Sequence, residues 1–142
     1  PYMKTQKLLA ASALVLGCVV AQAEFVVVVG AKSPVSTLTS EQVAQIFLGK
    51  VSTFPGGEQA SPIDQPDGVG IRNEFYEKLT NKTQKQVLAY RANMVFSGKG
   101  KPPKEVANSQ DVKKALSESP SSIGYIEKAA VDGSVKVVFT QP

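Results

Sequence analysis

The residues best suited to chemistry in this sequence lie in one short stretch, Asp67 to Leu79, which reads DGVGIRNEFYEKL. Ile71, Phe75 and Leu79 recur every fourth residue, which predicts an amphipathic helix that begins at a glycine turn. The first amides of a helix have no partners within it and carry partial positive charge, so they attract anions. The stretch therefore indicates either an oxyanion site, with Gly68, Val69, Gly70, Ile71 and Arg72 as its candidate residues, or only a tight bend into a surface helix.

Arg72 would add a planar fork of donors suited to an oxyanion. The spacing places it outside the apolar stripe of Ile71, Phe75 and Leu79, so we expect it to contribute little to stability. The hydroxyl residues Ser33, Ser36 and Thr37 follow the first predicted strand. Because ligands gather at the carboxyl ends of strands in open α/β sheets, Ser33 is included as a further candidate.

Several kinds of site are excluded by the residue types that the chain lacks. There is no His, and the one cysteine, Cys18, lies in an N-terminal apolar segment. A Ser-His-Asp triad and a downstream thiol nucleophile are therefore excluded, and we predict no catalytic residue and no enzyme activity. No loop has the spacing of a calcium site, so no metal and no cofactor are predicted. Asp64, Asp67 and Glu74 form the densest acidic cluster, which we interpret as a solvated turn with a favourable first-turn charge.

The N-terminus has the layout of a secretory signal peptide. Lys4 and Lys7 precede an apolar run from Leu8 to Ala21, and Ala21-Gln22-Ala23 is a small-x-small cleavage signal. We predict a signal peptide over residues 1–23, cleavage after Ala23, and a periplasmic domain over residues 24–142. The alternative is a lipoprotein, because Val15-Leu16-Gly17-Cys18 loosely matches the signal that precedes a lipidated cysteine.

Charge gives little support for a nucleic-acid partner. The formal net charge is +4 for 142 residues, and it falls to +2 for the 119 residues that remain without residues 1–23. No stripe of basic residues is interleaved with aromatic ones, so we predict no nucleic-acid binding. The remaining chain has no cysteine, so it has no disulfide and depends on its hydrophobic core.

Apolar patterning predicts strands that alternate with helices. Phe25 to Val29 (FVVVV) reads as a strand buried on both faces of a sheet. Capping boxes at Thr39 with Gln42 and at Thr83 with Gln86 predict two helix starts. Further elements are strands near 61–65, 123–126 and 135–139, a helix stop at Gly49, and a short helix capped by Ser109. The predicted class is α/β, with a largely parallel sheet flanked by helices.

Three segments resemble the phosphate-binding periplasmic proteins of ABC transporters. Thr39 to Lys50 (TSEQVAQIFLGK) is similar to a Leu-Ser-x-Glu-Gln-Leu-x-x-Ile-Phe-x-Gly-Lys segment of that family. Ser121 to Glu127 (SSIGYIE) is similar to its Ala-Ile-Gly-Tyr-Val-Glu strand. Between them, DGVGIRNEF stands where the family has Asp/Glu-Gly-Ser-Gly-Thr-Arg-x-x-Phe.

The resemblance implies one lobe of a type II periplasmic binding protein-like fold, whose members close two lobes around an anion. This chain is about half as long. Gly70 and Arg72 match the family motif, but Val69 and Ile71 replace the Ser and Thr whose hydroxyls bind phosphate. The expected function is therefore weak binding of phosphate or a related oxyanion, linked to phosphate uptake. The alternative is a periplasmic interaction module that kept the fold, lost the ligand, and docks on a transporter, an envelope protein or a second copy.

Overall fold

The computed structural model describes residues 24–98 and 102–141. Its elements follow in the order β1 (Phe25–Gly30), α1 (Ser40–Phe47), β2 (Ser61–Asp64), α2 (Gly70–Thr80), α3 (Gln84–Phe96), β3 (Lys104–Glu105), α4 (Ser109–Glu118), β4 (Ser122–Glu127), the 3₁₀ helix η1 (Lys128–Ala130) and β5 (Val135–Thr140). The predicted signal peptide and the lipoprotein alternative at Cys18 fall outside the described residues.

The strands form one mixed sheet in the order β3-β2-β4-β1-β5. β2 pairs in parallel with both β3 and β4, whereas β1 pairs antiparallel with both β4 and β5. Four strands therefore run in one direction and β1 alone runs in the other. The predicted α/β class and the shared direction of most strands are confirmed, and the reversed direction of β1 is a feature that the sequence did not predict.

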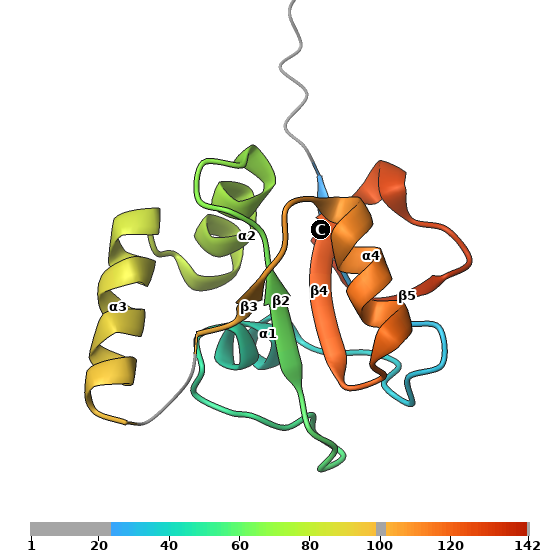
Figure 1. Ribbon diagram of the computed structural model, residues 1–142, viewed down its shortest axis with the longest axis horizontal. Helices are drawn as coiled ribbons and strands as arrows, with labels where there is room; N and C mark the ends of the chain where they lie inside the picture. The colour runs from blue at the N-terminus through green and yellow to red at the C-terminus, as the bar shows by residue number, and fades with distance from the viewer. Residues whose placement is uncertain (1–23, 99–101, 142) are drawn as a thin grey trace, which may run out of the picture.

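Helices cover both faces of the sheet, as Figure 1 shows. Val27 and Val29 of β1 belong to a core shared with α1 and α2, while Val26 and Val28 belong to a core shared with α4. Successive side chains of a strand point to opposite faces, so an unbroken β-branched run buries both sides. The prediction made from FVVVV, a strand buried on two faces, is confirmed.

α4 lies close against the sheet because two glycines leave it room. A Cβ atom at Gly124 would lie 2.5 Å from Cγ1 of Val112, and one at Gly30 would lie 2.6 Å from the carbonyl oxygen of Leu116. Real Cβ atoms essentially never come this close to another heavy atom. Glycine at these two positions therefore sets the distance between α4 and strands β1 and β4.

Local capping signals are mostly where the sequence predicts them. Both capping boxes are formed, at Thr39 for α1 and at Thr83 for α3. Gly49 has a φ of +80° directly after α1, as expected for a residue that ends a helix. The cap of α4 is Asn108 and not Ser109, because the Asn108 side chain accepts the amide of Asp111.

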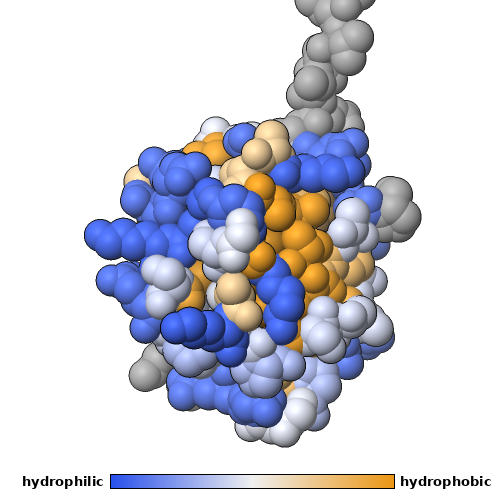
Figure 2. All heavy atoms as spheres, turned by 90° about the vertical axis from the view of Figure 1, so that its right-hand side faces the viewer, coloured by the Kyte–Doolittle hydropathy of each residue, from blue (hydrophilic) through white to orange (hydrophobic). Residues whose placement is uncertain are grey.

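The side of the molecule that carries β5 and α4 has an apolar area at its centre (Figure 2). β5 is the outermost strand of the sheet there. Val131, in the loop before β5, is exposed, and Val137 and Phe139 within β5 are half-buried. One edge of the sheet therefore presents apolar side chains to solvent.

Candidate anion site at the start of α2

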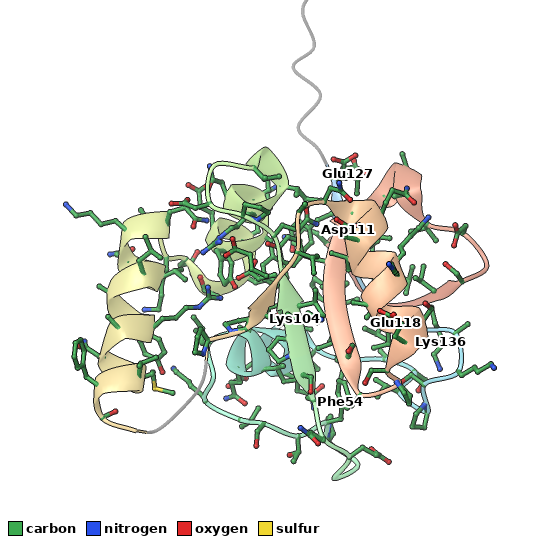
Figure 3. The ribbon with its side chains drawn as sticks, viewed as in Figure 1. Phe54, Lys104, Asp111, Glu118, Glu127 and Lys136 are labelled. Atoms are coloured by element: carbon green, nitrogen blue, oxygen red, sulfur yellow. The ribbon has the colours of Figure 1, made fainter. Side chains whose placement is uncertain are left out.

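The candidate site lies at the sheet edge where β2 and β4 end. β2 stops at Asp64, and residues 65–69 turn into α2, which begins at Gly70. β4 runs parallel to β2 and ends at Glu127, so both carboxyl ends meet at the same edge. Figure 3 labels Glu127 at that edge and Glu118, at the end of α4, toward the opposite one. The glycine turn thus lies at the edge where open α/β sheets bind ligands.

Backbone geometry leaves two donors at the start of α2. Gly68 has a φ of +94°, a conformation that glycine adopts without steric cost. The amide of Arg72 donates to the carbonyl oxygen of Val69 at 3.0 Å. Neither the Gly70 amide nor the Ile71 amide donates a hydrogen bond to any acceptor within residues 24–98 and 102–141. Open space surrounds the position of a Cβ atom at Gly70, so a small anion has access to this turn.

The apolar residues of the turn belong to the core. Ile71 is 2% exposed and packs in the same cluster as Phe75, while Val69 is half-buried against that cluster. Val69 is also the residue before the helix, and it makes no side-chain capping bond. Val69 and Ile71 can therefore offer an anion only their backbone groups.

Arg72 is buried, contrary to the expectation that it lies outside the packed stripe. It is 2% exposed, and its Nη1 donates to the carbonyl oxygen of Gln65 at 2.8 Å and lies 3.5 Å from Oε2 of Glu105. The expectation failed because the guanidinium meets the carbonyl oxygen of Gln65, in the turn after β2, and the carboxylate of Glu105, on β3 and far away in the sequence. The Nε atom of Arg72 is buried with no hydrogen-bond partner among the described residues.

A buried polar network anchors the start of the turn. Asp64 is 1% exposed, and its Oδ2 accepts the Tyr76 hydroxyl at 2.6 Å and Nη2 of Arg91 at 2.8 Å. Its Oδ1 accepts the Gln65 amide at 2.8 Å and also the hydroxyl of Tyr125. The interpretation of Asp64 as part of a solvated turn is therefore wrong, because four donors hold its carboxylate inside the protein.

In this network Tyr76 and Tyr125 are neutral, whereas Arg91 is charged. Burial, followed by the charge of Asp64, raises the pKa of Tyr76 and of Tyr125 well above the ordinary value. Burial opposes the charge on Arg91, but Tyr76 and Asp64 outweigh it and raise the pKa of the guanidinium. Both hydroxyls therefore stay protonated near neutral pH and donate to Asp64.

Ser33 lies at the opposite edge of the sheet from the glycine turn. Its hydroxyl accepts the amide of Val35 at 3.2 Å, and its carbonyl oxygen accepts Nζ of Lys136 at 2.7 Å. Figure 3 labels Lys136 at that edge. The structure separates Ser33 from the other candidates because β1 runs against the other strands, so its carboxyl end lies at their amino edge.

No group of three or more His, Cys, Asp or Glu side chains suited to a metal ion occurs within the residues that the structure covers. A hollow of about 580 Å³ lies at the amino edge of the sheet, and Lys50, Ser61, Glu118 and Ser122 are among the residues that line it. It therefore lies at the opposite end of β2 from the glycine turn.

Comparison with solved structures shows a shared fold with phosphate receptors. A protein assigned as a phosphate ABC transporter substrate-binding protein of Clostridium perfringens, solved with bound phosphate, superposes with a TM-score of 0.64 at 22% identity over 81% of this chain and 44% of that protein. An ABC-type phosphate transport receptor of Vibrio cholerae superposes with a TM-score of 0.66 at 21% identity, over 81% of this chain and 45% of that protein. PstS of Borrelia burgdorferi superposes with a TM-score of 0.63 at 17% identity, over 84% of this chain and 49% of that protein.

No protein-family model matches the sequence, and no curated protein matches it significantly. The chain spans less than half of the length of each of the three solved structures. At identities below 25%, the likeness establishes the fold and not the ligand. The chain is thus folded like one lobe, about half, of a phosphate ABC transporter substrate-binding protein.

Proposed function

We propose that this protein is a periplasmic, phosphate-receptor-like lobe that binds phosphate or a related oxyanion weakly at the start of α2. The observation that carries the proposal is the pair of Gly70 and Ile71 amides, which have no acceptor among the described residues, together with the open space around the Cβ position of Gly70. The fold shared with phosphate receptors supports the same choice of ligand. We propose no catalysis, because binding an anion at a helix start needs none.

The expected affinity is low because the donors are few. Two charge-assisted hydrogen bonds contribute roughly 3–6 kcal/mol together, and a dissociation constant of 1 mM corresponds to about 4 kcal/mol. In the phosphate-binding family that this sequence resembles, Ser and Thr hydroxyls lie on either side of the central glycine. Both are absent here, and the Arg72 guanidinium is directed inward. Binding in the millimolar range is therefore the expected result.

A titration followed by amide resonances tests this function. Phosphate, sulfate and acetate are added separately at constant ionic strength, first at low and then at moderate salt. Phosphate should shift the Gly70 and Ile71 amides more than amides at the far edge, such as that of Ser33, and added salt should weaken the effect. Equal small shifts across the whole protein would contradict a specific site.

The second candidate is an interaction module that lacks a ligand. The burial of Ile71 and the inward bonds of Arg72 favour it, because residues that would serve an anion serve the core here. Under this reading the fold remains while the surface contacts a transporter, an envelope protein or a second copy. A localised phosphate response at the turn would argue against it.

The proposed location depends on the predicted signal peptide. Intact-mass measurement of exported protein should find a chain that begins at Glu24. A lipid-modified chain that begins at Cys18 would show instead that the protein is anchored to a membrane.

A further inference from the structure

Gln65, which directly precedes the turn into α2, is fully buried. It is 1% exposed, whereas glutamine side chains lie mostly at protein surfaces. Its Nε2 donates to the carbonyl oxygen of Tyr125 on β4 at 2.9 Å and to the hydroxyl of Ser109, the first residue of α4, at 3.4 Å. A buried side-chain amide costs free energy unless it is hydrogen-bonded. These bonds therefore hold the segment after β2 against both β4 and α4.

The main chain of Gln65 is also held by buried groups. Its amide donates to Oδ1 of Asp64 at 2.8 Å and to the Tyr125 hydroxyl at 3.2 Å. Its carbonyl oxygen accepts Nη1 of Arg72 at 2.8 Å. Gln65 is thus fixed through its main chain and its side chain, by partners on β2, β4, α2 and α4.

Pro66 transmits the position of Gln65 to the turn. Proline fixes its own φ at about −65° and restricts the residue before it to extended backbone. Within residues 66–69 the Val69 amide donates to the carbonyl oxygen of Pro66 at 3.2 Å, and α2 begins at the next residue, Gly70. The connection from Gln65 to the Gly70 amide is therefore short and internally bonded, so a shift of Gln65 moves the turn.

We propose that Gln65 is a positioning residue for the oxyanion turn, because its side chain, anchored on β4 and α4, keeps the Gly70 and Ile71 amides in the arrangement that binds an anion. This inference rests on the proposed function and adds to it a buried residue that does not touch the ligand. Donors that are held in place before binding lose little conformational freedom when the anion arrives, so their rigidity raises the affinity. A residue that only filled the core would change stability and leave phosphate affinity as it is.

Gln65→Met and a matched control, Gln86→Met, test the proposal in the full chain. Methionine fills a similar volume but donates no hydrogen bond. Gln86 also bonds the backbone at a helix start, since its Oε1 accepts the Thr83 amide at 2.9 Å, but it belongs to α3. In a phosphate titration followed by amide resonances, Gln65→Met should bind roughly fivefold more weakly, because the anion must then order a looser turn. Gln86→Met should bind phosphate as the parent does.

Backbone order parameters of the phosphate-free protein give a second readout. The Gly70 and Ile71 amides of the parent should have values near about 0.85, as in rigid backbone, and Gln65→Met should lower them toward about 0.6. Gln86→Met should leave them unchanged. Ser109→Ala removes only the longer of the two side-chain bonds, so it should give smaller changes in the same direction. It decides the question where circular dichroism shows that Gln65→Met does not fold.

The outcomes distinguish this inference from the proposed function. A parent that binds phosphate at the turn, with a folded Gln65→Met that keeps either the parent affinity or the parent order parameters, overturns the inference alone. Equal weakening by Gln86→Met also overturns it, because a general loss of stability would then explain both variants. A parent without a localised phosphate response overturns the proposed function, and the inference with it.

Discussion

Asp64 and Arg72 hold the same short turn from two sides. The Asp64 carboxylate accepts a hydrogen bond from the amide of Gln65, and Arg72 donates one to the carbonyl oxygen of Gln65. Two buried side chains therefore fix the main chain of Gln65. The side chain of Gln65 adds a bond from Nε2 to the carbonyl oxygen of Tyr125 at 2.9 Å. Charged residues that sequence reasoning assigns to solvent or ligand therefore position the backbone that would meet an anion.

Arg72→Met tests this supporting role. Methionine fills much of the space but donates no hydrogen bond, so the carbonyl oxygen of Gln65 loses a buried partner. The free energy of unfolding should fall by about 1–3 kcal/mol in urea denaturation. Lys78→Met is the control, because Lys78 pairs with Glu74 on the surface of the same helix and should change stability by less than about 0.5 kcal/mol. Equal stability of Arg72→Met and the parent would show that the guanidinium does not support the turn.

The buried tyrosines predict a loss of stability at alkaline pH. Burial raises the folded-state pKa of Tyr76 and Tyr125, whereas tyrosines of the unfolded chain ionise near about pH 10. Above that pH the unfolded state binds fewer protons than the folded state, so stability falls as pH rises. Each tyrosine contributes a slope of about 1.4 kcal/mol per pH unit.

Urea denaturation between about pH 9 and 11 measures this slope. Tyr76→Phe removes one of the two groups, so its stability should fall less steeply than that of the parent by about 1.4 kcal/mol per pH unit. Lysines titrate in both chains and their effect cancels in the difference. Parallel slopes for the two proteins would contradict a raised pKa at Tyr76.

Among the secondary-structure elements, the start of α2 has two roles: its backbone is the proposed anion site, and its apolar side chains pack in the core. Val69 precedes the helix without a capping bond, and Ile71 lies in the core. The two positions therefore differ in what a hydroxyl would do there. Serine is a favourable cap at Val69, whereas threonine at Ile71 would replace a packed apolar side chain with a polar one.

Val69→Ser and Ile71→Thr should therefore have different effects. Val69→Ser adds a hydroxyl donor beside the free amides, and one charge-assisted bond is worth about 1.5–3 kcal/mol, so phosphate affinity should rise about tenfold at little cost in stability. Ile71→Thr should lower the free energy of unfolding by about 1–3 kcal/mol. Calorimetric titration and urea denaturation on the same samples measure both quantities. Folded Val69→Ser that binds phosphate no better than the parent would count against an anion at this turn.

At the scale of the whole molecule, signals that act within a few residues predict the structure well. The capping boxes at Thr39 and Thr83, the stop at Gly49 and the buried run of β1 depend on neighbours along the chain, and all four are present. The start of α2 at the glycine turn is likewise confirmed. Local patterning therefore predicts the α/β class and most of the elements, but not the short strand β3 or the 3₁₀ helix η1.

The features that sequence reasoning missed depend on partners far apart in the chain. Asp64 is buried because Tyr125 reaches it from β4, and Arg72 lies beside Glu105, which is 33 residues away in the sequence. Ser33 lies at the wrong edge for the proposed site because β1 is inserted antiparallel between β4 and β5. The spacing of residues within one segment does not predict which way a strand runs in the folded sheet. These features could therefore be found only from the structure.

A substitution at Gly70 tests whether the backbone at the start of α2 binds an oxyanion. Proline is tolerated at the first position of a helix, and Val69 already has the extended backbone that proline requires of the preceding residue. Gly70→Pro therefore removes one amide donor with little disturbance, and Gly70→Ala keeps it, with open space for either side chain.

The deciding measurement is the phosphate affinity of these two folded variants. We expect Gly70→Ala to bind phosphate as the parent does, and Gly70→Pro to bind it roughly tenfold or more weakly, since one charge-assisted hydrogen bond is lost. Equal phosphate affinity of Gly70→Pro and Gly70→Ala, with melting temperatures close to that of the parent, would show that the Gly70 amide does not bind phosphate.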